Sequence, residues 1–220
     1  MSKKIALLGE KDNFFLALKD RLERAGAIFT HDSTDADITV GLGQYATNDL
    51  VDVAIIAEND DPRSGNLDQI KNAGLIIRIH DLMIPEGSQG WGPIDVEDWV
   101  EWIRVESLDL TPEIKPKHWV HIRDTTDAVS LLVMADTDAF AQGVIDLCGR
   151  RAWTPDAVIS EINLLWHRFT NAITNSHTVE SLSGIPSPAA IQYEGKRLRP
   201  DLKPLHEAMQ NAGREEGWRP

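Results

Sequence analysis

Short apolar runs that alternate with helical patterns constrain the fold of this chain more than any other sequence feature. The runs are bounded by turn residues and include Ile5–Leu8, Val51–Ala57 and Gly74–Ile79. Strands this apolar are buried on both faces, as in a parallel sheet covered by helices. A helical pattern at Asn13–Ala25 follows the first run, and Gly26 is a typical residue to end such a helix. The sequence therefore predicts an α/β fold with a parallel sheet flanked by helices.

Further elements continue this alternation along the rest of the chain. Thr154 before a proline is a typical helix cap, so a helix is expected to start there. Asp124 or Thr125 is expected to cap an earlier helix. The expected strands are Ala27–Thr30, Ala36–Val40, Trp119–Ile122 and Gly143–Leu147, and the expected helices are Leu67–Asn72, Asp95–Val105, Thr126–Met134, Pro155–His167 and Leu202–Ala212.

A shift in composition near residue 150 predicts two domains. The segment 1–150 holds the expected strands and helices of the sheet, whereas the tail beyond it is richer in Ser, Pro and Arg. We therefore expect a main domain at 1–150 and a small C-terminal lobe at 151–220 packed on the first.

Charge and hydropathy exclude several kinds of partner. The net charge of −13 disfavours nonspecific binding to nucleic acid, which needs a basic face. No apolar run approaches the roughly 20 residues of a membrane span, and the apolar stretch after Lys3 and Lys4 is too short for a secretory signal. We expect a cytoplasmic protein with no nucleic-acid or membrane partner. The single cysteine, Cys148, is expected to be a buried packing residue rather than a catalytic thiol.

Four segments of the chain form an ordered set of motifs. They are Ile76–Pro85 followed by Gly92 and Pro93, Trp119–Ala128, Gly143–Gly149 followed by Trp153–Asp156, and Arg197–Asp201 with Gly217–Pro220. In this order they resemble segments of the extended short-chain dehydrogenase/reductase family, the NAD-dependent sugar-nucleotide epimerases and dehydratases. The resemblance implies a Rossmann-like sheet, a small substrate lobe, NAD as cofactor and a nucleotide-sugar-like ligand. Within it, Arg78, Arg197 and Arg199 match positions that bind the substrate, where guanidinium groups suit phosphate oxygens.

The first strand and helix depart from the family pattern. The family carries a GxxGxxG turn that lets the pyrophosphate approach the helix N-terminus. Here Gly9 is present, but Asp12 and Phe15 stand at the next two glycine positions, bringing a negative charge and a bulky ring. Gly9 remains the candidate for the cofactor turn. Asp32, after the second strand, is a candidate for the ribose hydroxyls, and its alternative role is that of a solvated turn acid.

The catalytic pattern of the family is also missing from the sequence. The resemblance implies a Tyr-xxx-Lys pair, in which lysine lowers the pKa of the tyrosine that transfers the proton. Neither Tyr45 nor Tyr193 has lysine four residues later. Any acid–base group must then be an unexpected residue, and Lys71 and His80 are the first candidates. No HxxxH or HExxH pattern occurs, so no metal site is expected.

Two hypotheses for the function follow. The first is a divergent, shortened epimerase/dehydratase-like protein that binds a nucleotide-sugar-type ligand. The second is a non-catalytic binding or assembly protein that retains only the fold. Family members often dimerise through helix packing, so the resemblance also implies a homodimer, and the aromatic stripe of Trp99 and Trp102 is a candidate face for it.

Overall fold

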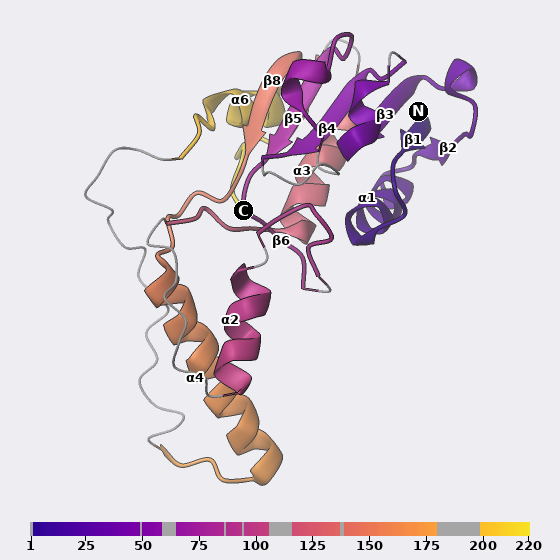
Figure 1. The fold of residues 1–220 in the computed structure, drawn as a ribbon. Coiled ribbons are helices and arrows are strands. Elements are labelled where there is room, and N and C mark those ends of the chain that lie inside the picture. The colour runs from indigo at the N-terminus through magenta and orange to yellow at the C-terminus, as the bar shows by residue number, and fades with distance from the viewer. Residues whose placement is uncertain are drawn as a thin grey trace. The chain divides into compact units, whose positions relative to one another are not determined.

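The chain forms two compact units in its computed structural model (Figure 1). Unit 1 consists of Met1–Pro93, Trp119–Arg150 and Leu198–Pro220, and unit 2 consists of Ile94–His118 and Arg151–Arg197. The structure describes residues 2–48, 50–58, 65–85, 87–93, 95–105, 116–136, 139–179 and 199–220.

Unit 1 is built on a sheet of six strands that all run parallel. Their order across the sheet is β2-β1-β3-β4-β5-β8, so the chain moves to one side of β1 and then to the other. The predicted parallel sheet of an α/β fold is therefore confirmed. The strands are β1 (Lys4–Leu8), β2 (Ile28–Phe29), β3 (Ile38–Leu42), β4 (Val53–Ala57), β5 (Leu75–Ile79) and β8 (Gly143–Leu147).

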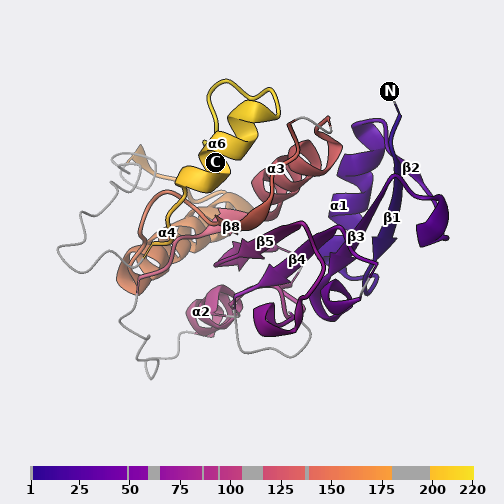
Figure 2. The same ribbon diagram turned by 90° about the horizontal axis from the view of Figure 1, so that it is seen from above.

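Three helices of unit 1 cover one face of this sheet, as Figure 2 shows: α1 (Asn13–Arg24), α3 (Ile122–Met134) and α6 (Lys203–Asn211). They bury apolar side chains such as Leu18 and Leu132 against the strands. The opposite face carries a smaller cluster around Ala54 and Ile56, under 3₁₀ turns at Gly43–Thr47 and Leu67–Gln69. The predicted helix at Leu67–Asn72 is thus a single short turn, since three residues cannot build the hydrogen-bonded ladder of an α-helix.

The start of α3 differs from the prediction. A two-stranded sheet pairs β6 (Leu82–Met83) with β7 (Val120–His121), and α3 begins directly afterwards at Ile122. The expected caps were Asp124 or Thr125, but His121 is the cap, and its Nδ1 accepts the backbone N–H of Arg123 at 3.1 Å. Imidazole is outside the usual set of capping side chains, which is why the sequence pattern placed the start too late.

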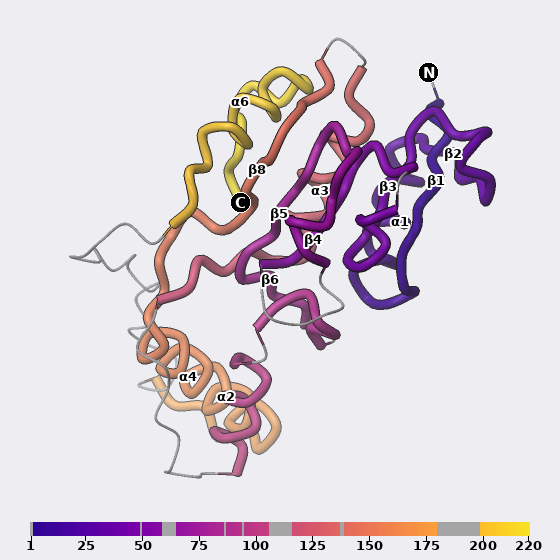
Figure 3. Tube along the Cα trace, turned by 45° about the horizontal axis from the view of Figure 1, so that its top comes forward, coloured from indigo at the N-terminus to yellow at the C-terminus, as the bar shows by residue number. Residues whose placement is uncertain are grey.

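In the C-terminal segment of unit 1, helix α6 lies next to β8, as Figure 3 shows. Leu205 and Met209 of α6 are fully buried. Trp218 is 2% exposed, and its indole Nε1 donates to the backbone oxygen of Cys148 at 2.8 Å. This hydrogen bond ties the end of the chain to the residue that follows β8.

Among its described residues, unit 2 contains two helices, α2 (Asp95–Arg104) and α4 (Pro155–Thr174), which pack on each other. The hydroxyl of Thr154 accepts the N–H of Ala157, so the predicted cap is confirmed. α4 runs past the predicted end at His167. Of the two tryptophans on α2, Trp99 is 4% exposed, so it is a packing residue of this unit.

Within the described residues, no helix is both long and apolar enough to cross a membrane. No group of three or more His, Cys, Asp or Glu side chains suited to a metal ion is found in that same part of the chain.

Candidate functional site

A cluster of charged side chains lies where β5 and β8 approach their carboxyl ends. Arg78 of β5 stands opposite Asp146 of β8 in the register of the sheet. Its Nε donates to Oδ1 of Asp146 at 2.5 Å, and its Nη2 donates to Oδ2 at 3.0 Å. The Nη1 group lies 3.7 Å from the carboxylate of Glu58, which follows β4. The guanidinium is therefore bracketed by carboxylates from two neighbouring strands.

His80 completes the cluster from the residue after β5. Its Nε2 lies 2.7 Å from Oδ1 of Asp146, and both side chains are largely buried, at 16% and 18% exposure. The backbone N–H of His80 bonds to the carbonyl of Leu147, which fixes the position of the residue. Asp81 then adopts a left-handed φ of 49°, a conformation uncommon for a residue other than glycine. The chain bends sharply at the point where the imidazole is held.

These neighbours determine the charge of Asp146. Burial alone raises the pKa of this carboxyl group, but hydrogen bonds from His80 and Arg78 outweigh it and hold the pKa at about 2. The hydrogen bond to Asp146 in turn raises the pKa of Arg78. Asp146 is thus a permanent anion at neutral pH, and it orients the imidazole of His80. Such a carboxylate–imidazole pair is suited to binding a polar ligand or transferring a proton.

The other candidate catalytic residue, Lys71, lies at the opposite end of β5 from His80. It is exposed and precedes the first residue of the strand, whereas His80 follows the last one. Five strand residues at about 3.3 Å each put roughly 16 Å between the two ends. Lys71 and His80 therefore cannot act on the same reacting atom.

The predicted substrate arginines have different surroundings. Arg78 is part of the charged cluster, as described above. Arg199 donates from Nη1 to the carbonyl of Arg150 at 2.9 Å, and its Nε is buried with no hydrogen-bond partner among the described residues. Arg197 lies outside the described residues. Burial raises the pKa of the Cys148 thiol, and the positive charge of Arg199 partly offsets this rise.

The predicted cofactor turn lies between the carboxyl ends of β1 and β3. Sheets of this type bind ligands where the chain crosses to the other side of the first strand, which here is the gap between β1 and β3. A small pocket lies there, but its cavity volume of about 10 Å³ is room for about one water molecule and far below the range of about 300–1,000 Å³ for small-molecule sites. Its described lining carries the carboxylates of Glu10 and Asp12 and no Lys or Arg side chain. This charge disfavours a pyrophosphate.

The residues of this turn do not fit NAD. A methyl group added at Gly9 would lie 3.0 Å from the ring of Phe15 and 3.1 Å from Cβ of Leu42, so the space above the glycine is filled. Asp12 caps α1, and its Oδ1 accepts the N–H of Phe15 at 2.8 Å. A carboxylate therefore sits where the helix N-terminus would bind a phosphate.

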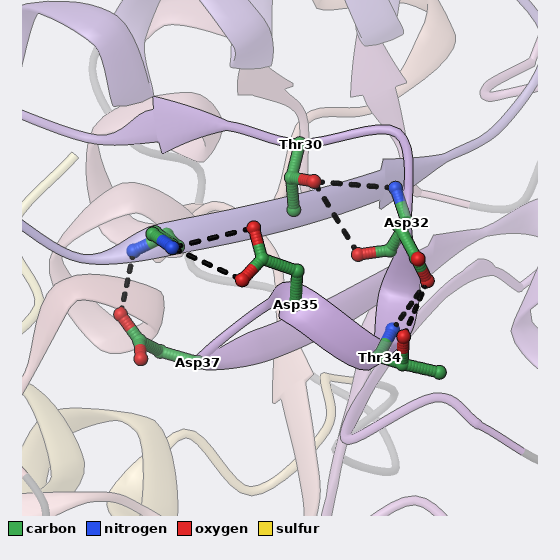
Figure 4. A network of polar contacts seen from close by, with 6 residues as sticks. Thr30, Asp32, Thr34, Asp35 and Asp37 are labelled. Atoms are coloured by element: carbon green, nitrogen blue, oxygen red, sulfur yellow. Dashed lines mark hydrogen bonds and ion pairs between the residues drawn. The ribbon is translucent and has the colours of Figure 1, made fainter.

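Asp32, the predicted ribose ligand, lies after β2 and is engaged locally (Figure 4). Its Oδ1 accepts the backbone N–H of Thr34 at 2.9 Å and the hydroxyl of Thr34 at 2.7 Å. The side-chain hydrogen bond lowers the pKa of Asp32. The neighbouring Asp35 and Asp37 bind Lys4 at the start of β1. The contacts of Asp32 are those of a turn cap, and ribose binding stays a prediction.

Asp146 is the member of the charged cluster that the sequence did not indicate. The available signal was one acidic residue inside an otherwise apolar strand, Gly143–Leu147. Asp81 is the acidic residue next to His80 in the sequence, but the hydrogen bond of His80 goes to Asp146, 66 positions later. Only the register of β5 and β8 brings them together.

Comparisons with known proteins give matches among solved structures alone. No family model and no curated protein sequence matches the chain. The UDP-N-acetylglucosamine 4-epimerase of Bacillus cereus is 12% identical with a TM-score of 0.51, over 74% of this chain and 81% of that one. An epimerase of Methanothermobacter thermautotrophicus is 11% identical with a TM-score of 0.50, over 76% and 77%. A protein of Methylobacillus flagellatus, assigned to the NAD-dependent epimerases/dehydratases, is 10% identical with a TM-score of 0.53, over 76% and 83%.

These likenesses confirm the fold that the sequence resemblance implied. Because the identities are only 10–12%, these likenesses establish the fold alone. The ligand and the chemistry have to be argued from the residues of the site. The chain therefore has the Rossmann-like α/β fold that these epimerase structures share.

Proposed function

We propose that the chain binds a nucleotide-sugar-type ligand and does not catalyse an NAD-dependent reaction. The charged cluster of Arg78, His80 and Asp146 carries this proposal, because it lies by the carboxyl ends of β5 and β8, the side of a parallel α/β sheet on which ligands bind. The Bacillus cereus protein of the same fold is named as an epimerase that acts on a UDP-sugar, UDP-N-acetylglucosamine. The filled turn at Gly9 and the missing Tyr-xxx-Lys pair argue against the NAD-dependent reaction.

The ligand's phosphate groups would compete with Asp146 and Glu58 for the guanidinium of Arg78. A bidentate guanidinium suits either a carboxylate or a phosphate, so an exchange of partners keeps both hydrogen bonds. The imidazole of His80 would then be available to a sugar hydroxyl. Arg199 is a second candidate, since its buried Nε has no partner among the described residues.

Thermal and chemical stability in the presence of ligands tests the proposal. A UDP-sugar at 100 times its Kd adds about 2.7 kcal/mol to the free energy of unfolding, and NAD adds nothing. The double variant Arg78→Gln/Asp146→Asn loses the effect without leaving a buried charge unpaired. Arg24→Gln is the matched control, since Arg24 is exposed and pairs with Asp20 of its own helix. Stabilisation by NAD, or none by any nucleotide sugar, contradicts the proposal.

An enzyme that uses His80 as its acid–base group is the second candidate. The observation in its favour is the 2.7 Å contact between Nε2 of His80 and Asp146, which orients the imidazole. Chromatography of UDP-N-acetylglucosamine incubated with the protein and NAD would detect an epimerised sugar. His80→Gln should then abolish turnover and Lys71→Gln should leave it unchanged, because Lys71 lies at the far end of β5.

The implied homodimer stays a prediction. Trp99 of α2 is already buried within unit 2, whereas Val100 is 37% exposed and offers a more accessible part of the same helix. Light scattering coupled to gel filtration gives the mass directly. A mass of one chain, about 24.5 kDa, would rule the dimer out.

A further inference from the structure

The loop Gly87–Trp91 lies on the N-terminus of α1. The carbonyl oxygen Oε1 of Gln89 accepts the backbone N–H of Asn13 at 2.9 Å. The side chain of Asn13 also donates to the carbonyl of Gly87 at 3.5 Å. Asn13 is the first residue of the helix, and its N–H has no partner inside the helix. A side chain from 76 positions away therefore satisfies a group that a bound anion would otherwise take.

Trp91 joins the same loop to the cap of α1. Its indole Nε1 donates to Oδ2 of Asp12 at 2.7 Å, while Oδ1 of Asp12 accepts the N–H of Phe15 at 2.8 Å. One carboxylate thus binds the helix and the loop together. The indole is 5% exposed and lies 4.4 Å from the ring of Phe14, centroid to centroid. The loop is seated on the helix by both hydrogen bonds and apolar contact.

The backbone of the loop is shaped for this contact. Gly87, Gln89 and Gly90 have φ values of 110°, 48° and 92°. A left-handed conformation is uncommon for glutamine and is held only where the surroundings compensate for it. At the far end, a methyl group added to Gly92 would lie 1.9 Å from the carbonyl oxygen of Leu82, so the chain runs tightly against β6. The loop is fixed at both ends.

We infer that the loop Gly87–Trp91 is an internal occupant of the anion-binding end of α1, and closes this position to pyrophosphate-bearing ligands. Oε1 of Gln89 and Oδ1 of Asp12 are oxygen acceptors on the N–H groups of Asn13 and Phe15, where phosphate oxygens would bind. The indole Nε1 of Trp91 donates to the other carboxylate oxygen, Oδ2 of Asp12. This position and the cluster at β5 and β8 are separate, so either proposal can fail without the other.

Binding of inorganic pyrophosphate and of NAD, measured by calorimetry, tests the inference. Because the phosphates of a nucleotide sugar are proposed to bind at Arg78, every protein compared, the wild-type reference included, also carries Arg78→Gln, and this reference should bind neither at millimolar concentration. The triple variant Asp12→Ser/Gln89→Ala/Trp91→Phe should bind pyrophosphate at least tenfold more tightly than wild type. Serine keeps the helix cap without the charge, and phenylalanine keeps the packing on Phe14 without the N–H donor. Gln44→Ala is the matched control, because Gln44 lines the same pocket but bonds to Glu10.

Two outcomes overturn the inference. One is pyrophosphate binding by the wild-type protein that equals binding by the triple variant. The other is a folded triple variant, with native amide signals from α1, that binds no pyrophosphate.

Amide hydrogen exchange gives a second measurement that needs only one substitution. Gln89→Ala should speed the exchange of the Asn13 N–H at least tenfold, while Gln44→Ala leaves it unchanged. The N–H of Phe15 keeps its bond to Asp12 in both variants and serves as the internal reference. Unchanged exchange at Asn13 in Gln89→Ala would show that the loop does not occupy the helix end.

Discussion

Arg78 and Asp146 stand directly opposite each other in parallel strands and form a two-point ion pair, with distances of 2.5 and 3.0 Å. β8 lies at the edge of the six-stranded sheet and pairs with β5 alone. The ion pair therefore adds a side-chain connection to the backbone ladder that attaches this edge strand. The same carboxylate holds His80, so the attachment of β8 and the geometry of the candidate site depend on one residue.

Acid should weaken the protein through Asp146. The folded pKa of about 2 lies below the ordinary value of 3.8, so the stabilisation is present above pH 4 and is lost as pH falls from about 4 to 2. The lowered pKa corresponds to about 2 kcal/mol. In urea titrations, Asp146→Asn should lower the free energy of unfolding at pH 7 by about this amount and flatten its decline between pH 4 and pH 2.

The matched control is Asp35→Asn. Asp35 pairs with Lys4 on the surface and its side chain is 63% exposed, so the loss should be about 0.5 kcal/mol or less. Equal losses for the two variants would contradict a special role for Asp146.

Cys148 should be unreactive in the folded protein. It is fully buried, and burial, aided by the negative charge of Asp81, raises the pKa of its thiol to about 12. Because the thiolate is the reactive form, a disulfide reagent at pH 8 should modify native protein at least about a thousandfold more slowly than unfolded protein. The chain has one cysteine, so the released chromophore reports this thiol alone. Similar rates for native and denatured protein would contradict the burial.

Much of the sheet could be predicted because its strands are mostly apolar. Ile5–Leu8, Gly74–Ile79 and Gly143–Leu147 all coincide with strands of the structure. Local chemistry also located helix ends: Thr154 caps α4, and Gly26, with a φ of 94°, follows the end of α1. These are signals that neighbouring residues carry by themselves.

The candidate site could be predicted only in part. His80 and Arg78 were singled out from the sequence, but their shared partner Asp146 lies 66 and 68 positions away and is brought to them by strand register. The contact between the loop Gly87–Trp91 and α1 could not be predicted for the same reason, since Gln89 and Asn13 are 76 positions apart. Pairings of this kind leave no periodic pattern in the sequence.

The anchoring of the C-terminal segment should depend on Trp218. Its buried indole Nε1 donates to the carbonyl of Cys148, and Trp218→Phe leaves that oxygen without this donor. We expect a loss of about 1–3 kcal/mol in the free energy of unfolding. Trp166→Phe is the control, because Trp166 is half-buried on α4 and stacks on Phe169, which phenylalanine can also do. A loss at Trp218 no larger than at Trp166 would show that the hydrogen bond does not hold the segment.

Gly92→Ala should destabilise the protein although it adds only one methyl group. The added Cβ would lie 1.9 Å from the carbonyl oxygen of Leu82, a backbone atom that cannot move aside without displacing β6. Overpacking of this kind costs about 1–3 kcal/mol or more. Gly74→Ala adds the same methyl group at 3.9 Å from the backbone oxygen of Asp52, an ordinary contact, and should change stability by about 0.5 kcal/mol or less. Urea titration of both variants measures these losses. An unchanged free energy of unfolding in Gly92→Ala would mean that the chain does not run against Leu82.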